Sequence, residues 1–115
     1  MQFTLNTFSI TQDSLPIAGT VAQRLLLKFG DPASNDLIVR DVDVKMRDLK
    51  STTLTGGRLV LLNGAASLPV IAAVVHHVAH LFAVVAVYDP KLGGYVVAVS
   101  HDPDLVIGDI LRESH

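Results

Sequence analysis

Length, composition and charge set the first limits on this chain. It has 115 residues, half of them apolar, and no cysteine. This length fits a single domain over residues 1–115 with its own core, and the lack of cysteine excludes disulfides and thiolate metal sites. The formal net charge is −2. We therefore expect no duplex nucleic acid as a partner, since such binding favours basic proteins, although a local pocket can still hold a small anion.

One apolar run raises the question of a membrane. Leu68–Val87 is nearly apolar and long enough to suggest a membrane span. Histidines at positions 76, 77 and 80 interrupt it, and its second part is β-branched. A buried helix followed by a buried strand fits this run better than a span, because polar groups at bilayer depth are costly. The N-terminus also lacks the pattern of a secretory signal, so we expect a soluble, cytoplasmic protein.

The N-terminal half predicts two strands separated by a helix. Alternating apolar residues indicate a strand over Gln2–Ile10, and Thr11–Pro16 is typical of a polar connection. Apolar residues at helical spacing favour a short helix within Ile17–Phe29. Leu37–Val44 is apolar and then alternates, which favours a second strand. Arg47–Thr55 is polar, and we expect it to be exposed.

The C-terminal half predicts a strand, a helix and further strands. Arg58–Leu62 is a short apolar run after two glycines, which is typical of a buried strand. A helix is expected over Leu68–His80, because Ser67 is a good N-cap and Pro69 lies in the first turn. The last expected strands are Phe82–Tyr88 and Tyr95–Ser100, joined as a hairpin, and Val106–Leu111.

The loop before the expected helix is a candidate anion site. A strand, a loop of small residues, a helix and a strand form a βαβ-like unit, so the class is α/β. In such a unit the loop Asn63–Ser67 lies at the helix N-terminus, where backbone N–H groups and the helix dipole attract phosphate. Loops of this kind are also small and polar for turn geometry alone.

Histidines and an aspartate supply the candidate chemistry. His76, His77 and His80 have helical spacing, while Asp89 and His101 each follow an expected strand. If those strands lie beside the helix, His80, Asp89 and His101 meet at one edge of the sheet. Histidine and carboxylate ligands together suit manganese, iron or zinc, and a neutral histidine can act as a general base toward a ribose 2′-hydroxyl.

Each of these residues also has a structural interpretation. His76 or His77 can find a backbone partner within the apolar helix. Asp89 before a proline can begin a turn, and the segment 101–104 can form a capped turn. The spacing alone leaves both kinds of interpretation open.

A motif in the C-terminal half carries a family resemblance. Ala86–Gly93 reads Ala-Val-Tyr-Asp-Pro-Lys-Leu-Gly, a valine-rich strand follows and ends in Ser100-His101, and a Gly-Asp pair stands at 108 and 109. Gly64 and His80 fall in register upstream. Over residues 58–110 the chain resembles the small manganese-dependent ring nucleases of type III CRISPR systems.

The resemblance implies a small Rossmann-like domain related to the CRISPR-associated sensor domains for cyclic oligoadenylate. It implies a homodimer that can associate further. The implied activity is a Mn²⁺-dependent phosphodiesterase that cleaves cyclic tetra-adenylate to linear oligoadenylates and so switches off antiviral signalling. Some members are similar to 3′ exoribonucleases that act on oligoadenylate tails.

The resemblance also implies roles for single residues. His80, Asp89 and His101 match catalytic positions, and Asp89 with His80 matches the metal site. Lys91 matches a basic position that meets phosphate. Gly64 matches the ligand-binding loop, in which we also expect Ser67 to contact the ligand.

Departures from the family pattern keep other functions open. The loop at 63–69 lacks the arginine and tryptophan often found near its glycine, and Lys91 replaces an arginine that could hold phosphate with two parallel hydrogen bonds. A second hypothesis is a sensor or regulatory module that binds a cyclic oligonucleotide without cutting it. A third is a hydrolase with zinc on His76 and His80.

Overall fold

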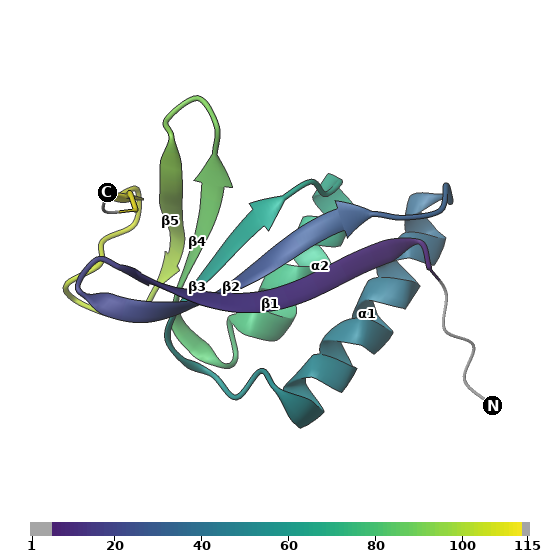
Figure 1. Cartoon of the computed structure of the whole chain (residues 1–115), viewed down its shortest axis with the longest axis horizontal. Coiled ribbons are helices and arrows are strands. Elements are labelled where there is room, and N and C mark those ends of the chain that lie inside the picture. The colour runs from purple at the N-terminus through teal and green to yellow at the C-terminus, as the bar shows by residue number, and fades with distance from the viewer. Residues whose placement is uncertain (1–5, 114–115) are drawn as a thin grey trace.

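The structure, a computed structural model, describes residues 6–113. Over these residues the chain forms one mixed sheet of six strands, with two helices on one of its faces (Figure 1). The elements are β1 (Phe8–Ile17), β2 (Thr20–Phe29), α1 (Asn35–Thr52), β3 (Gly57–Gly64), α2 (Leu68–Val78), β4 (Phe82–Asp89), β5 (Gly94–Ser100) and β6 (Ile110–Leu111). The expected α/β class is confirmed.

The strands lie across the sheet in chain order, from β1 to β6. β2, β3 and β4 pair in parallel, while β1 and β2, β4 and β5, and β5 and β6 pair antiparallel. Parallel neighbours need crossovers, and α1 and α2 supply them. As a result, the carboxyl ends of β2, β3 and β4 and the amino ends of α1 and α2 lie at the same end of the molecule.

The hairpin of β1 and β2 overturns two expectations. Neither a polar connection over 11–16 nor a helix within 17–29 forms, because both segments pair as strands along ten residues each. Ala18 and Gly19 have φ angles of 52° and 73°, as a two-residue hairpin turn requires. The polar residues of β1 are explained by its place at the sheet edge. The start of the expected first strand, residues 2–5, lies outside the described residues.

The strand expected over Leu37–Val44 is also wrong, because this segment lies inside helix α1. Ile38, Val42 and Met46 are spaced four residues apart and are all buried against the sheet. Residues at that spacing share one face of a helix, and their burial outweighs the alternation that suggested a strand. The polar segment 47–55 contains the last turns of the same helix.

The elements expected in the C-terminal half are confirmed, apart from one. β3, α2, β4 and β5 form where the sequence predicts them, and β4 and β5 form the expected hairpin. The last strand is limited to Ile110–Leu111, because much of the segment expected as a strand turns instead: the Asp109 carboxylate and backbone N–H bond back to Val106.

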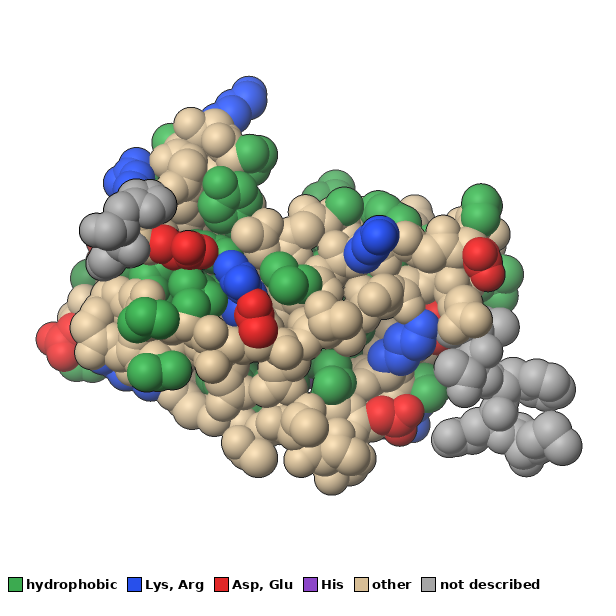
Figure 2. Space-filling model, viewed as in Figure 1, with side chains coloured by type: hydrophobic (Ala, Val, Ile, Leu, Met, Phe, Trp, Pro, Cys, Tyr) green, Lys and Arg blue, Asp and Glu red, His purple; other side chains and the backbone are tan. Residues whose placement is uncertain are grey.

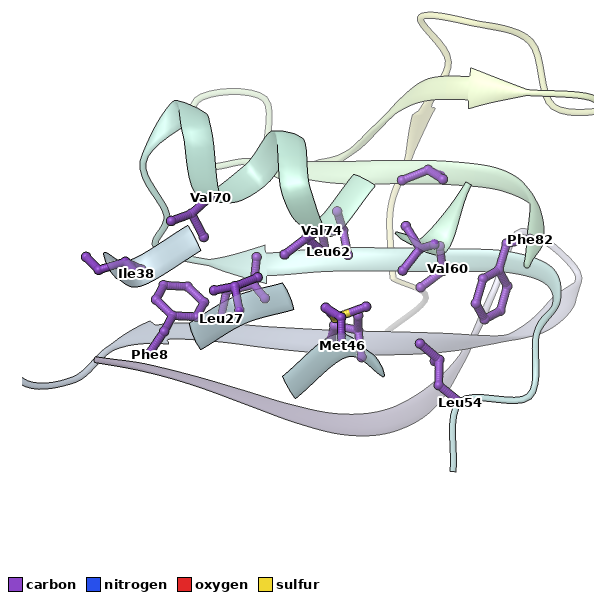
Figure 3. Packing of buried hydrophobic residues seen from close by; sticks show 14 residues of the cluster. Phe8, Leu27, Ile38, Met46, Leu54, Val60, Leu62, Val70, Val74 and Phe82 are labelled. Carbon is purple, nitrogen blue, oxygen red and sulfur yellow. The ribbon is translucent and has the colours of Figure 1, made fainter. Parts of the chain in front are cut away.

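Two apolar clusters lie on the two faces of the sheet. The larger one fills the space between the helices and the sheet and includes Phe8, Met46 and Val74 (Figure 3). The smaller one lies on the helix-free face, where Leu105 and Leu111 of the C-terminal segment pack against the sheet. In the described part of the chain, no helix has the length and apolar character that crossing a membrane requires.

A buried carboxylate joins helix α1 to the start of the chain. Asp41 is 4% exposed, and its Oδ2 accepts hydrogen bonds from the backbone N–H of Thr7 at 3.1 Å and from the Thr7 hydroxyl at 2.7 Å. Lys45 pairs with the same oxygen at 3.0 Å and also donates to the carbonyl of Phe8. The charge of Asp41 is thereby compensated, and the beginning of β1 is fixed to the helix.

We expect Asp41→Ala to lower the free energy of unfolding by about 3 kcal/mol, because it removes the acceptor of several charge-assisted hydrogen bonds in a buried place. Urea denaturation measures this change. Asp48→Ala is the matched control on the exposed side of the same helix and should stay within about 0.5 kcal/mol of the wild type. Equal effects of the two substitutions would contradict a special role of Asp41.

Candidate functional site

Strands β3 and β4 diverge at their carboxyl ends. Their pairing ends at Leu62 and Val87, but β4 continues to pair with β5 as far as Asp89 and Gly94. The β4–β5 hairpin therefore leaves the plane of the sheet (Figure 1). In Figure 2 it forms a lobe that stands above the rest of the surface and leaves a notch beside it. Side chains that follow the last pair, such as Asn63 and Tyr88, border this opening.

A pocket of about 200 Å³ lies on the helix side of this divergence, and we call it the helix-side pocket. It is lined by Leu27, Leu62, Asn63, Gly64, Ala65, Ala66, Ile71, Val87 and Tyr88. Gly64 has a φ of 111°, and a Cβ atom there would lie 2.0 Å from the carbonyl oxygen of Leu27. A glycine is required at this position by the backbone alone, whatever ligand the pocket takes.

The amino ends of α1 and α2 meet beside this pocket. Ser67 stands at the N-cap position of α2, and its hydroxyl donates to Oδ1 of Asn35 in α1 at 2.8 Å. The first turn of α2 has no acidic residue, whereas Asp36 lies in the first turn of α1. The unpaired N–H groups at the start of α2 are therefore the better position for an anion. The loop at 63–67 therefore lies at the helix N-terminus as expected, and its binding of an anion stays a prediction.

Asp89 forms a turn at the tip of the hairpin. Its Oδ1 accepts hydrogen bonds from the backbone N–H groups of Lys91 at 2.8 Å and Leu92 at 3.2 Å. The structural interpretation of Asp89 is therefore observed. Its Oδ2 has no hydrogen bond within the described structure, so one oxygen stays available to a ligand. The side chain of Lys91 is exposed at the same tip.

A second pocket, of about 410 Å³, lies on the helix-free side, and we call it the hairpin-side pocket. It is lined by Asn63, Tyr88, Gly93, Gly94, Tyr95, Arg112 and Glu113. The rings of Tyr88 and Tyr95 contact each other with their centroids 5.2 Å apart. Sequence reasoning missed this pocket. The signal that could have found it is the placing of tyrosines at the two strand ends that flank the hairpin loop.

His80 and His101 lie at the opposite end of β4 from Asp89. His80 precedes β4, and the backbone N–H of His101 donates to the carbonyl of Ala83 at 2.8 Å. Six residues of strand separate Ala83 from Asp89, which corresponds to about 20 Å. The expectation that His80, Asp89 and His101 meet within one chain is therefore wrong. The reason is that β5 runs antiparallel to β4, so its end returns to the start of β4.

The expected metal ligands Asp89 and His80 are separated in the same way. Among the described residues, no group of three or more histidine or acidic side chains could hold a metal ion. The donor groups of residues 6–113 within one chain therefore do not fit Mn²⁺. The roles of Asp89 and His80 in metal binding stay predictions. Each of these residues would need further metal ligands from outside its own chain.

The neighbouring histidines of α2 have different environments. His77 is 7% exposed, and its Nε2 lies 2.7 Å from Oδ1 of Asp43 in α1. Because a carboxylate only accepts, Nε2 donates there, while Nδ1 is buried and has no hydrogen-bond partner among residues 6–113. His77 thus has a carboxylate partner rather than the backbone partner that was expected. The exposed rings of His76 and His80 contact each other with centroids 5.0 Å apart.

An ion pair holds the loop that carries His101. Nε of Arg58, at the start of β3, donates to Oδ2 of Asp102 at 2.6 Å, and Oδ1 of Asp102 accepts from the backbone N–H of Asp104. The Arg58 guanidinium lowers the pKa of Asp102 below its ordinary value, with help from the Asp104 N–H. The expected capped turn at 101–104 is observed. It fixes the backbone beside His101 while the imidazole stays exposed.

The two ends of β4 therefore offer complementary chemistry. The carboxyl end combines a helix N-terminus, a free carboxylate oxygen and an exposed lysine, which suits phosphate groups. The amino end presents the exposed imidazoles of His80 and His101, which can donate or accept hydrogen bonds. Neither end alone combines groups that suit phosphate with exposed histidines.

The contact of Asp43 with His77 gives a pH-dependent stability. The hydrogen bond from His77, followed by the charge of Arg47, lowers the pKa of Asp43 below its ordinary value of 3.8. Because the folded pKa is lowered, the stabilisation is present above pH 3.8 and is lost as the pH falls through the folded pKa. We expect Asp43→Asn to cost at most about 1 kcal/mol at pH 7, since the carboxylate is partly screened by solvent.

Urea denaturation at pH 7 and pH 3 measures this contribution. The difference between wild type and Asp43→Asn should shrink at pH 3, because the lowered pKa of Asp43 contributes less stability once the pH is below the ordinary value of 3.8. A difference that is unchanged between the two pH values would show that the Asp43 charge contributes nothing.

Comparison with known proteins places the chain in a family. No curated protein matches it. The family model described as CRISPR-associated protein (Cas_csx3) matches residues 37–112, which is more than half of the chain and runs from α1 to β6. The CRISPR association implied by the motif around Asp89 is thereby confirmed: the chain belongs to the Cas_csx3 family of CRISPR-associated proteins.

Proposed function

We propose that this protein is a ring nuclease that cleaves cyclic tetra-adenylate to linear oligoadenylates and so ends a type III CRISPR signal. The observation that carries the proposal is the carboxyl end of β3 and β4. There the α2 N-terminus and the helix-side pocket lie at the base of the β4–β5 hairpin, whose tip carries Asp89 and Lys91. We also propose that the fold is related to the sensor domains for cyclic oligoadenylate.

The phosphates of the ring bind at the helix-side pocket in this proposal. The N–H groups in the first turn of α2, which follow the loop of Gly64 and Ser67, would face a phosphate, and no acidic residue in that turn opposes it. The Gly64 N–H and the Ser67 hydroxyl donate to Asn63 and Asn35, so these two residues would shape the loop. Lys91 adds a positive charge from the hairpin. It acts as a point charge, because an ammonium group lacks the planar fork of a guanidinium.

The active site is completed between chains in this proposal. Asp89 and the two histidines lie at opposite ends of β4, so no rotation of side chains can bring them together in one chain. A head-to-tail contact of two chains, or of two homodimers, places the Asp89 end of one against the His80 and His101 end of the next. We propose that Asp89 of one chain and His80 of another would hold Mn²⁺ in this arrangement. A divalent ion supplies positive charge toward a phosphoryl oxygen.

The reaction needs a base for the ribose. A neutral imidazole of His80 or His101 accepts the proton of a 2′-hydroxyl, and the 2′-oxygen then forms a bond to the adjacent phosphorus. The bond from phosphorus to the 5′-oxygen breaks, and that oxygen takes up a proton. The product is a linear chain with a 2′,3′-cyclic phosphate and a free 5′-hydroxyl.

A second candidate function is a sensor that binds the ring without cutting it. The observation that favours it is the completeness of the phosphate-binding end within one chain, in contrast to the divided histidines. A third candidate, the 3′ exoribonuclease of oligoadenylate tails, would use the same residues on a linear substrate. The two nucleases differ in product, because an exonuclease releases mononucleotides from a free 3′ end.

Product analysis tests the proposal directly. The purified protein is incubated with labelled cyclic tetra-adenylate, with and without Mn²⁺, and the products are separated by chromatography. We expect linear oligoadenylates only with the metal. Intact ligand that elutes together with the protein would support the sensor. A ligand that is neither bound nor cleaved would refute both functions.

Asp89→Asn separates the two roles of that residue in the same assay. An asparagine oxygen can accept the same turn hydrogen bonds, so the hairpin is kept while the charge is lost. We expect turnover to fall by a factor of about 100 or more, in the range of a lost electrostatic contribution. Asp48→Asn, an exposed carboxylate on α1, is the control and should keep full turnover. Full activity of Asp89→Asn under saturating Mn²⁺ would remove Asp89 from the metal site.

Mixing two inactive variants tests whether the site is shared. His80→Ala and Asp89→Asn should each be inactive alone. In an equal mixture, half of the chains keep Asp89 and the other half keep His80. About a quarter of the head-to-tail contacts therefore join an intact Asp89 to an intact His80. We therefore expect activity to return to about that share of the wild type. A mixture as inactive as its components, under conditions where the chains exchange, would contradict a shared site.

A further inference from the structure

We propose that the hairpin-side pocket binds an adenine base of the cyclic oligoadenylate whose phosphates lie at the helix-side pocket. This inference rests on the proposed function and adds the residues that would select the base. It concerns the helix-free side of the diverging strands, to which neither the family resemblance nor the motif around Asp89 assigns a role.

The two pockets are neighbours on opposite sides of the same opening. Both are lined by Asn63 and Tyr88, the first residues after the last β3–β4 pair. A nucleotide has a phosphate and a base at the two ends of a sugar, so it can reach from one pocket to the other. The volume of the hairpin-side pocket, about 410 Å³, lies within the usual range for small-molecule sites, roughly 300–1,000 Å³.

The tyrosines give the pocket an aromatic surface. Tyr88 is 37% exposed, so part of its ring is open to solvent, and it rests on the buried ring of Tyr95 at an interplanar angle of 66°. A ring that is supported from behind loses little freedom when a base stacks on it. Stacking of a base on an exposed aromatic side chain is a common means of binding single nucleotides.

Polar groups at the base of the pocket are partly unsatisfied. The Tyr95 hydroxyl accepts hydrogen bonds from Nδ2 of Asn63 at 3.0 Å and from Arg24 at 3.4 Å, although Tyr95 is only 1% exposed. Its own proton has no acceptor in the described part of the chain. The hydroxyl oxygen is thus used twice as an acceptor, and its proton can still be donated to an acceptor of a ligand. A purine ring nitrogen is such an acceptor.

Glu113 supplies a hydrogen-bond acceptor at the rim of the pocket. Its carboxylate is 47% exposed and contacts Arg24 at 3.3 Å. It can therefore accept a hydrogen bond from an exocyclic amine. Adenine carries an amine donor beside a ring-nitrogen acceptor, whereas guanine and hypoxanthine carry a carbonyl oxygen in place of that amine. The carboxylate would face that oxygen without a proton between them, so the pocket favours adenine.

Equilibrium binding of two ring ligands tests this inference. Cyclic tetra-adenylate and cyclic tetra-inosinate are titrated into the full-length protein without metal, so that neither is cleaved. Wild type should prefer the adenine ring. Glu113→Gln should lower this preference by roughly tenfold, since an amide can also donate to the carbonyl. Tyr88→Leu should weaken binding of both rings by roughly tenfold or more, the usual effect of a lost stacking partner.

Asp13→Asn is the matched control. Asp13 makes two hydrogen bonds with the same Arg24 but does not line the pocket. It should leave the preference for adenine unchanged, which separates a direct effect of Glu113 from an effect through Arg24. Both Glu113→Gln and Tyr88→Leu could instead keep the wild-type preference and affinity. That result would contradict the binding of a base in this pocket and leave the proposed function intact. Binding of neither ring by the wild type would overturn both.

Discussion

The parallel pairing of β2, β3 and β4 is the constraint on which the rest of the structure depends. Parallel strands need crossovers, and here the crossovers are α1 and α2, which run back along one face of the sheet. This arrangement brings the amino ends of the helices and the carboxyl ends of the strands together, where Ser67 contacts Asn35. The groups that we propose to bind phosphate therefore lie at one end as a direct result of the topology. The antiparallel hairpin of β4 and β5 then sends the histidine-bearing segment to the opposite end.

Several residues serve the fold and remain available to chemistry. Asp89 closes the hairpin turn with one oxygen and leaves the other unbound. Gly64 is fixed by its backbone approach to Leu27, although the ligand loop contains it. A substitution at either position therefore changes the structure as well as any ligand binding that we propose for it. This is why an isosteric change such as aspartate to asparagine is more informative than a truncation.

The C-terminal half could be predicted from the sequence because its signals are local. Ser67 and Pro69 mark the start of α2, and glycines mark the ends of β3 and of the hairpin loop. The N-terminal half could not be predicted in the same way. Val39 to Val44 alternates like a strand, and only packing of Ile38, Val42 and Met46 against the sheet decides for a helix. In the hairpin of β1 and β2, the turn at Ala18 and Gly19 was the local signal, and the polar composition of an edge strand obscured it.

The candidate site shows the same limit. The residue types and the loop at 63–67 could be identified from spacing, but the relative placement of His80, Asp89 and His101 depends on strand direction, which spacing does not contain. The hairpin-side pocket depends on where two strands stop pairing, and that point lies between residues that are distant in sequence.

The order of the strands has a consequence for synthesis of the protein. Because spatial order follows chain order from β1 to β6, each new strand can add to the edge left by the previous one, and none must insert between two strands already in place. Chains emerge from the ribosome N-terminus first and fold as they emerge. The core between sheet and helices can therefore close once β4 has been made. The hairpin and Glu113 then add to an already folded base, so the hairpin-side pocket forms after the helix-facing part of the molecule.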